Sequence, residues 1–106
     1  MKGGELKAVA EIFRVVSFEN RLKIIKALSS GPKTWSELMF ALKMNPKILD
    51  ESLKKLIIAG VIVKEGNKYR LTGIGDYILQ IIEPLAQTVV DVIESLFKGF
   101  YSKKKK

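Results

Sequence analysis

The chain of 106 residues contains neither cysteine nor histidine. Without cysteine it can form no disulfide, no thiolate zinc site and no iron–sulfur cluster, and it has no thiol nucleophile. Without histidine it lacks the usual general base, the commonest metal ligand and every histidine-based catalytic triad. Its carboxylates show no clustered pattern with ligand spacing either. We therefore expect no enzyme, no catalytic residue, no metal site and no cofactor.

The sequence also has no long uninterrupted apolar run. Its most apolar stretch, residues 74–100, is broken by five charged residues and by Pro84, so it predicts no membrane span. The first residues lack the hydrophobic run of a signal peptide, which favours a cytoplasmic protein. With 47% apolar and 28% charged residues, the composition is that of one globular domain.

Positive charge is in excess and is unevenly distributed. Nineteen basic residues against eleven acidic ones give a net charge of +8. Residues 1–73 carry a net +7, residues 74–102 a net −3, and the four lysines at 103–106 add +4. A basic body with this distribution points first to a polyanionic partner such as nucleic acid.

Apolar periodicity and turn residues divide the chain into short elements. The segment Thr34-Trp35-Ser36-Glu37 fits a capping box, Asn45 and Pro46 fit the cap and first position of a helix, and Gly60 fits its C-terminal stop. Pro84 is expected to kink or divide the last helix. The predicted elements are helices over 4–17, 19–29, 35–43 and 46–59, a hairpin of 61–64 with 68–72, and a helix over 74–100.

This order predicts a mainly α protein with a small β-hairpin. Two helices joined by a tight turn and followed at once by a hairpin describe a winged helix-turn-helix domain. We expect this DNA-binding domain over residues 1–73, including the N-terminal helix. A C-terminal dimerisation helix is expected over 74–101, and a disordered basic tail over 102–106.

Four segments of the sequence show a family pattern when they are taken together. RLKIIKAL at 21–28, EL at 37–38, LKMN at 42–45 and LKKLIIAGVI at 53–62 resemble the ArsR-type winged-helix transcription regulators, and YRLTGIG at 69–75 resembles the second wing strand and the start of the next helix. The resemblance covers about residues 18–75. It implies a homodimer that binds operator DNA through the fourth helix and the wing. The chain lacks the cysteine and histidine ligands of the family's metal sensors, and Asp50-Glu51-Ser52 replaces its usual small polar residues and histidine.

The predicted helix 46–59 carries the first candidate contacts with double-stranded DNA. The face opposite its core presents Lys47, Glu51, Lys54 and Ile58. The lysines could contact phosphates or guanine, and Asp50 or Glu51 could accept a hydrogen bond from cytosine. Further basic residues flank the short helix and occupy the hairpin. The candidate DNA-binding residues are Lys33, Trp35, Lys43, Asn45, Lys47, Asp50, Glu51, Lys54, Lys55, Lys64, Lys68 and Arg70.

Other interpretations of these residues remain open in the sequence. Asp50–Lys54 and Glu51–Lys55 are acid-before-base pairs four residues apart, which stabilise an exposed helix without any ligand. Trp35 could stack on a base, or it could only pack. Arg21 could contact phosphate or have a structural role. The same fold could also serve as a protein–protein interaction module with little or no sequence-specific DNA binding.

The first and last helices are predicted to form a homodimer. A small central motif cannot cover two apolar helical stripes, so the uncovered ones need a partner. The alternatives are that both helices pack within a monomer, or that the aromatic and basic C-terminus binds a membrane surface. The sequence identifies no effector, and a DNA-bound dimer would be associated with the nucleoid. The candidate interface residues are Val9, Ile12, Phe13, Val16, Ile78, Ile81, Leu85, Val89, Val92 and Leu96.

Overall fold

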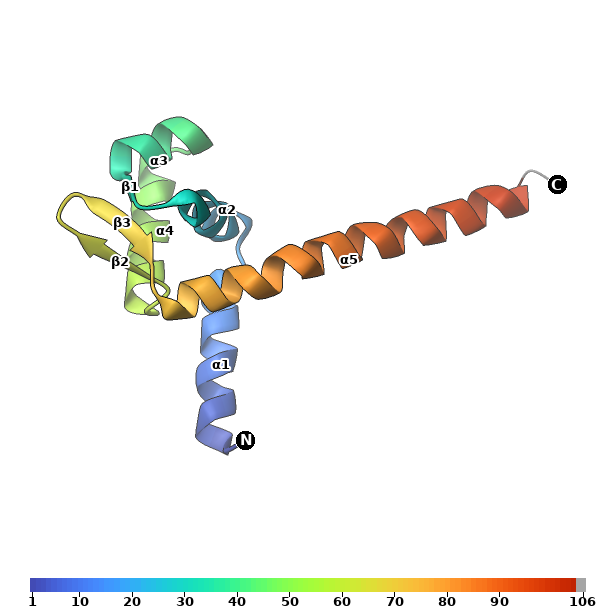
Figure 1. Ribbon diagram of the computed structural model, residues 1–106, viewed down its shortest axis with the longest axis horizontal. Helices are drawn as coiled ribbons and strands as arrows, with labels where there is room; N and C mark the ends of the chain where they lie inside the picture. Colours follow the sequence, from blue (N-terminus) through green and yellow to red (C-terminus); the bar gives the residue numbers. More distant parts are fainter. Residues whose placement is uncertain (105–106) are drawn as a thin grey trace.

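Two helices project from a small body of helices and strands (Figure 1). The computed structural model describes residues 1–104, and the side chains of residues 1–99. The predicted mainly α fold with a small β-hairpin is confirmed. Its elements are α1 (Gly3–Val16), α2 (Glu19–Ala27), the 3-10 turn η1 (Leu28–Ser30), β1 (Lys33–Thr34), α3 (Trp35–Leu42), α4 (Pro46–Ile58), β2 (Ile62–Glu65), β3 (Lys68–Leu71) and α5 (Gly73–Lys104).

The wing contains a strand that the sequence did not predict. β1 pairs antiparallel with β3, with Lys33 opposite Tyr69 and Thr34 opposite Lys68. β2 pairs with the other edge of β3, so the strand order is β1-β3-β2. A strand of two residues shows no alternation of apolar and polar side chains, and so the sequence gives no signal for it. Its effect is to tie the start of α3 to the wing.

The helix ends follow the local signals in the sequence. The Thr34 hydroxyl accepts a hydrogen bond from the Glu37 amide at 3.1 Å, and Glu37 Oε1 accepts one from the Thr34 amide at 2.8 Å, which completes the capping box. Asn45 Oδ1 accepts from the Lys47 amide at 2.8 Å at the start of α4. Gly60, with a φ of 77°, ends α4 in the left-handed conformation that glycine favours. These caps fix where α3 and α4 begin and where α4 ends.

The core lies between α2, α3, α4 and the sheet. The inner face predicted for α4 is confirmed, since Leu49, Leu53 and Leu56 are all buried. The fully buried side chains come from four elements and the turn before β2; they are Ile24, Ile25, Leu38, Leu49, Leu56, Val61 and Ile62. This core fixes the position of α4 beneath the sheet and leaves the opposite side of α4 to solvent.

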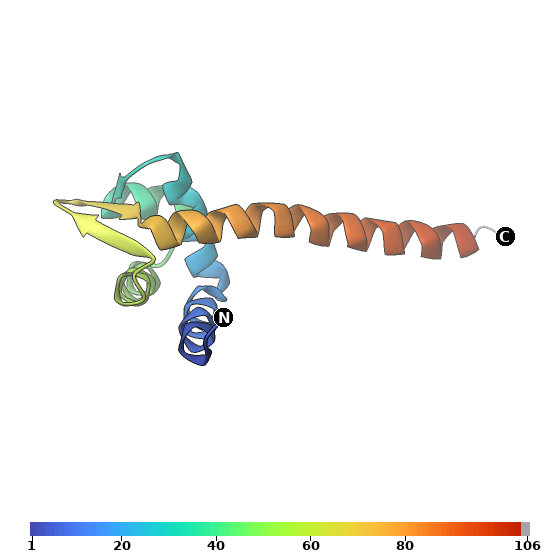
Figure 2. The same ribbon diagram turned by 60° about the horizontal axis from the view of Figure 1, so that its bottom comes forward.

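α5 is one continuous helix, so the division expected at Pro84 does not occur. Figures 1 and 2 both show it as a single rod that leaves the body. Proline removes the hydrogen-bond partner of the Gln80 carbonyl, but Gln80 is exposed and water can satisfy it. Lys26 Nζ lies 2.7 Å from Glu83 Oε2 and joins α2 to α5. Every side chain from Leu85 to Gly99 is exposed.

Candidate nucleic-acid interface

The outer side of α4 presents the charged residues that its sequence pattern predicts. Lys47, Glu51, Lys54 and Lys55 are all exposed, and no other element of residues 1–104 covers them. Ile58, at the end of the same face, is 81% exposed. This face therefore combines three cations with one carboxylate and ends in an apolar side chain.

The cations of the wing differ in whether they are already ion-paired. Lys64 and Lys68 are exposed, and Lys64 Nζ lies 5.5 Å from the centre of the Tyr69 ring. Arg70 is already paired, because its Nε and Nη2 donate to the two carboxylate oxygens of Glu65 at 2.6 and 2.9 Å. These hydrogen bonds raise the pKa of Arg70 and lower the pKa of Glu65. The two lysines are thus better placed to meet a phosphate than Arg70 is.

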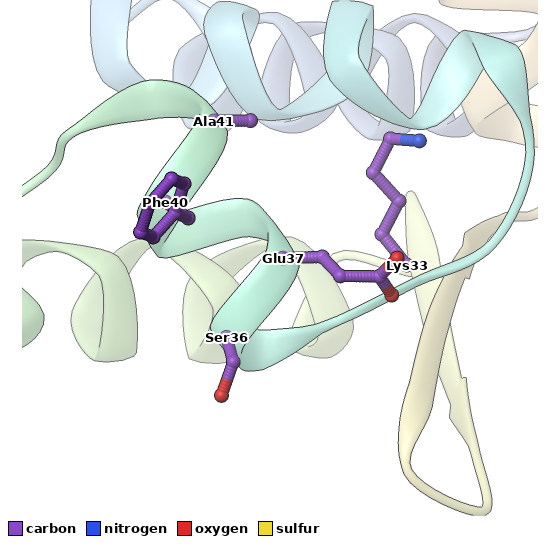
Figure 3. Close-up of a pocket in the computed structure, with 5 residues that line it drawn as sticks. All are labelled: Lys33, Ser36, Glu37, Phe40 and Ala41. Carbon is purple, nitrogen blue, oxygen red and sulfur yellow. The ribbon is translucent and has the colours of Figure 1, made fainter.

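Glu37 lies close to two further candidate cations. Figure 3 shows its side chain beside Lys33, in a shallow hollow of α3 that Phe40 and Ala41 also line. The backbone hydrogen bond from Thr34 lowers the pKa of Glu37, and the Thr34 side chain and the charges of Lys68 and Lys33 act in the same direction. The carboxylate thus stays ionised beside these lysines and offsets part of their positive charge.

Replacing Glu37 with glutamine is expected to keep the cap and remove its pH dependence, because glutamine also completes a capping box. The lowered pKa of Glu37 in the folded chain means that its ionised form stabilises the fold above its ordinary pKa of 4.5. That stability is lost as the pH falls through the lowered value. As the pH falls below about 4.5, the melting temperature of the unmodified protein should fall further than that of Glu37→Gln. Equal decreases in the two melting temperatures would show that the ionised carboxylate of Glu37 does not stabilise the fold.

Trp35 and Asp50 meet across the helix-turn-helix. The indole Nε1 donates a hydrogen bond to Asp50 Oδ1 at 2.7 Å. Trp35 is partly buried and packs against the core. The helix-supporting pairs Asp50–Lys54 and Glu51–Lys55 are not formed. The ion pairs between side chains of residues 1–99 are Glu11–Arg14, Lys26–Glu83 and Glu65–Arg70.

Three other candidates have local structural roles. Lys43 ends α3 in the left-handed conformation, with a φ of 50°. The Asn45 side chain is occupied by its cap of α4. Arg21 Nη1 donates to the Val15 carbonyl at 2.8 Å, and its guanidinium lies 4.2 Å from the centre of the Phe18 ring. The structure therefore assigns Arg21 to the junction between α1 and α2.

The predicted dimer residues fall into two groups. Val16 and Ile78 belong to the core of the protomer, at 4% and 5% exposure, so their assignment to a dimer interface was wrong. Ile12 is partly buried against the same core. Helical spacing marks an apolar stripe, but it does not say which part of the stripe packs within the chain. The remaining candidates are exposed: Val9, Phe13, Ile81, Leu85, Val89, Val92 and Leu96.

The exposed apolar surface is wider than the sequence analysis proposed. Ile74 and Tyr77 join Val9 and Phe13 in an apolar groove between α1 and the start of α5. Farther along α5 a second stripe, Val90, Ile93 and Phe97, is exposed beside the first. Its spacing of three and four residues was visible in the sequence. The basic tail predicted as disordered over 102–106 is helical as far as the structure describes it, because α5 continues to Lys104. The last two residues lie outside the described residues, and the side chains from Phe100 onward are not described.

Within the described residues no three acidic side chains gather as a metal site would require. No helix among them combines the length and the apolar character needed to cross a membrane.

The fold and this site define a winged helix-turn-helix protein. The family model described as "Bacterial regulatory protein, arsR family" matches residues 19–64, from the start of α2 into β2. Residues 19–64 therefore match the model of this family, and the resemblance found in the sequence is confirmed there. This family description names a regulator and not an enzyme, as the sequence predicts. None of the curated proteins matches the chain.

Several solved structures share the fold of this chain over most of their length. The transcriptional repressor BigR from Xylella fastidiosa is 21% identical, with a TM-score of 0.70 over 77% of this chain and 86% of BigR. Quinone-bound YodB from B. subtilis is 26% identical, with a TM-score of 0.69 over 78% and 94%. The homodimeric winged helix-turn-helix DNA-binding domain of Mb0332 from Mycobacterium bovis is 24% identical, with a TM-score of 0.64 over 86% and 91%.

Proposed function

We propose that this protein is a homodimeric, DNA-binding transcriptional regulator that works at the nucleoid. In this proposal α4 enters the major groove and the wing contacts the backbone or the minor groove. The observation that carries the proposal is the uncovered outer face of α4, with Lys47, Lys54 and Lys55 exposed on a helix whose other side is anchored in the core. An α-helix fits the major groove, and lysines there neutralise phosphates or reach base edges.

The wing extends the same cationic surface. Lys64 and Lys68 are exposed on the hairpin that follows α4, and Lys33 lies on β1, which pairs with β3 of that hairpin. Cations on neighbouring elements of one motif can follow the phosphate backbone on both sides of a groove. The arsR-family match over α2 to β2 and the DNA-binding homodimer named for Mb0332 support the same function.

Substituting the lysines of α4 should weaken duplex binding and reduce its dependence on salt. Removing one lysine–phosphate contact reduces the slope of log affinity against log salt by about 1, so in a homodimer the slope should decrease by about 2 for each of Lys47→Ala and Lys54→Ala. Titrations of a duplex at several salt concentrations measure these slopes. Lys23→Ala is a matched control, because Lys23 is an exposed lysine of α2 that faces α5. Slopes that stay unchanged in both α4 variants would contradict the groove placement.

A protein–protein interaction module is the second candidate, and two exposed side chains favour it. Phe40 on α3 and Ile58 on α4 are each 81% exposed, and large apolar side chains left uncovered on neighbouring elements are available to contact another protein. Such a module would bind duplex DNA weakly, or with a shallow salt dependence. The titrations above therefore separate the two candidates.

A further inference from the structure

The only tryptophan of the chain connects the two elements proposed to contact DNA. Trp35 directly follows β1, whose two residues pair with β3 of the wing. Its main chain is fixed from the other side by the Thr34–Glu37 capping box. From this position the indole Nε1 donates its hydrogen bond to Asp50 of α4, at 2.7 Å. One side chain thus links the sheet of the wing with the helix beside it.

We infer that Trp35 and Asp50 are positioning residues that set the orientation of α4 relative to the wing, and that Asp50 does not read bases. The buried leucines of α4 determine which face of the helix meets the core, and apolar contacts have little directional preference beyond that. A hydrogen bond to a carboxylate has a preferred distance and direction and is stronger than a neutral one. The Trp35–Asp50 hydrogen bond supplies that directional restraint.

Because of this hydrogen bond, the adjacent carboxylates of Asp50 and Glu51 have different roles. Asp50 is held by Trp35 on the flank of α4, where a hollow beside Leu53 and Tyr69 lies between α4 and β3. Glu51 lies on the outer face between Lys47 and Lys54, and it forms no ion pair with a side chain of residues 1–99. Glu51 is therefore the carboxylate that meets the DNA, where it can accept a hydrogen bond from cytosine and repels phosphate elsewhere.

The test compares variants that keep or remove the acceptor, and its first part needs no DNA. Asp50→Asn keeps an Oδ1 acceptor and removes the charge, whereas Asp50→Ala and Trp35→Phe remove the hydrogen bond. Thermal unfolding of Trp35→Phe, Asp50→Ala and their double variant should show coupling, so that the double variant is no less stable than the worse single one. The emission spectrum of Trp35 should change in Asp50→Ala, and it should change much less in Asp50→Asn and in the control Glu51→Gln. Additive unfolding effects and unchanged spectra would overturn the link.

The second part rests on the proposed function and measures DNA selectivity. The probes are a duplex selected from a random pool and a scrambled duplex of the same length. Asp50→Ala and Trp35→Phe should each reduce the ratio of the two affinities about ten-fold, because α4 loses its fixed orientation. For Asp50→Asn, which keeps the acceptor, the ratio should stay within about two-fold of that of the unmodified protein. Glu51→Gln should change the ratio of the two affinities and leave the tryptophan emission unaltered.

The possible failures can be told apart. If Asp50→Asn lowers selectivity as much as Asp50→Ala, the carboxylate charge itself is read and the positioning role is wrong. If the unmodified protein binds no duplex while the unfolding cycle still shows coupling, the proposed function fails and the hydrogen bond serves only stability. If neither binding nor coupling is seen, both proposals are wrong.

Discussion

Gly75→Ala is expected to destabilise the protein by about 3 kcal/mol, at the upper end of the usual cost of overpacking. A Cβ atom at this position would collide with the backbone carbonyl oxygen of Val61 and would lie 3.0 Å from a methyl carbon of Leu71. The Leu71 side chain can shift, but the Val61 carbonyl cannot. It accepts hydrogen bonds from both the amide and the hydroxyl of Thr72, each at 3.0 Å. To avoid this collision, the start of α5 must move away from Val61 in the turn before β2.

Thermal unfolding at a fixed protein concentration measures this effect. A loss of about 3 kcal/mol corresponds to a decrease of about 15 °C in the melting temperature of a domain of this size. Gly73→Ala is the matched control, because a Cβ at Gly73 meets nothing within 4 Å and alanine suits a helix better than glycine does. Its melting temperature should stay the same or rise. Similar melting temperatures for the two variants would show that the junction between the wing and α5 is not closely packed.

Local signals in the sequence were sufficient for most element boundaries. The capping box, the Asn45-Pro46 start of α4 and the Gly60 stop each depend on residues within one turn of the helix end. Such signals act through hydrogen bonds between near neighbours in the chain, and so they can be recognised without knowing the fold. They placed α4 and its inner face correctly, and this placement led to the candidate interface.

Contacts between elements could not be predicted in the same way. The Trp35–Asp50 hydrogen bond joins residues fifteen positions apart, and nothing in either segment indicates the other. The sequence suggests only a contact with cytosine or a pair with Lys54 for Asp50, because Lys54 is its neighbour in any helix. Val16 and Ile78 lie in the apolar stripes predicted for the first and last helices. The part of each stripe that is buried in the protomer core depends on how α1 and α5 pack against the body, which the sequence does not show.

A negative charge on the apolar stripe of α5 is expected to dissociate the proposed homodimer. Leu85 and Val92 are 56% and 52% exposed on a helix that the rest of the described chain leaves uncovered beyond Pro84. A face this apolar needs a partner, and a second copy of the same helix offers a matching surface. An unpaired carboxylate buried there from each copy should raise the dimer dissociation constant about 100-fold or more for Leu85→Asp and for Val92→Asp.

Sedimentation velocity over a range of concentrations measures this dissociation. Gln87→Glu is the control, because Gln87 is exposed on the polar side of α5, where it donates a hydrogen bond to Asp91 at 2.9 Å. It adds the same charge to the same helix and should leave the dimer intact. The monomeric variants should also bind one duplex more weakly, because two linked α4 helices no longer act together, while their helix content stays unchanged. If Leu85→Asp and Val92→Asp both remain dimers, the interface must lie elsewhere, and the groove between α1 and the start of α5 is then the next surface to test.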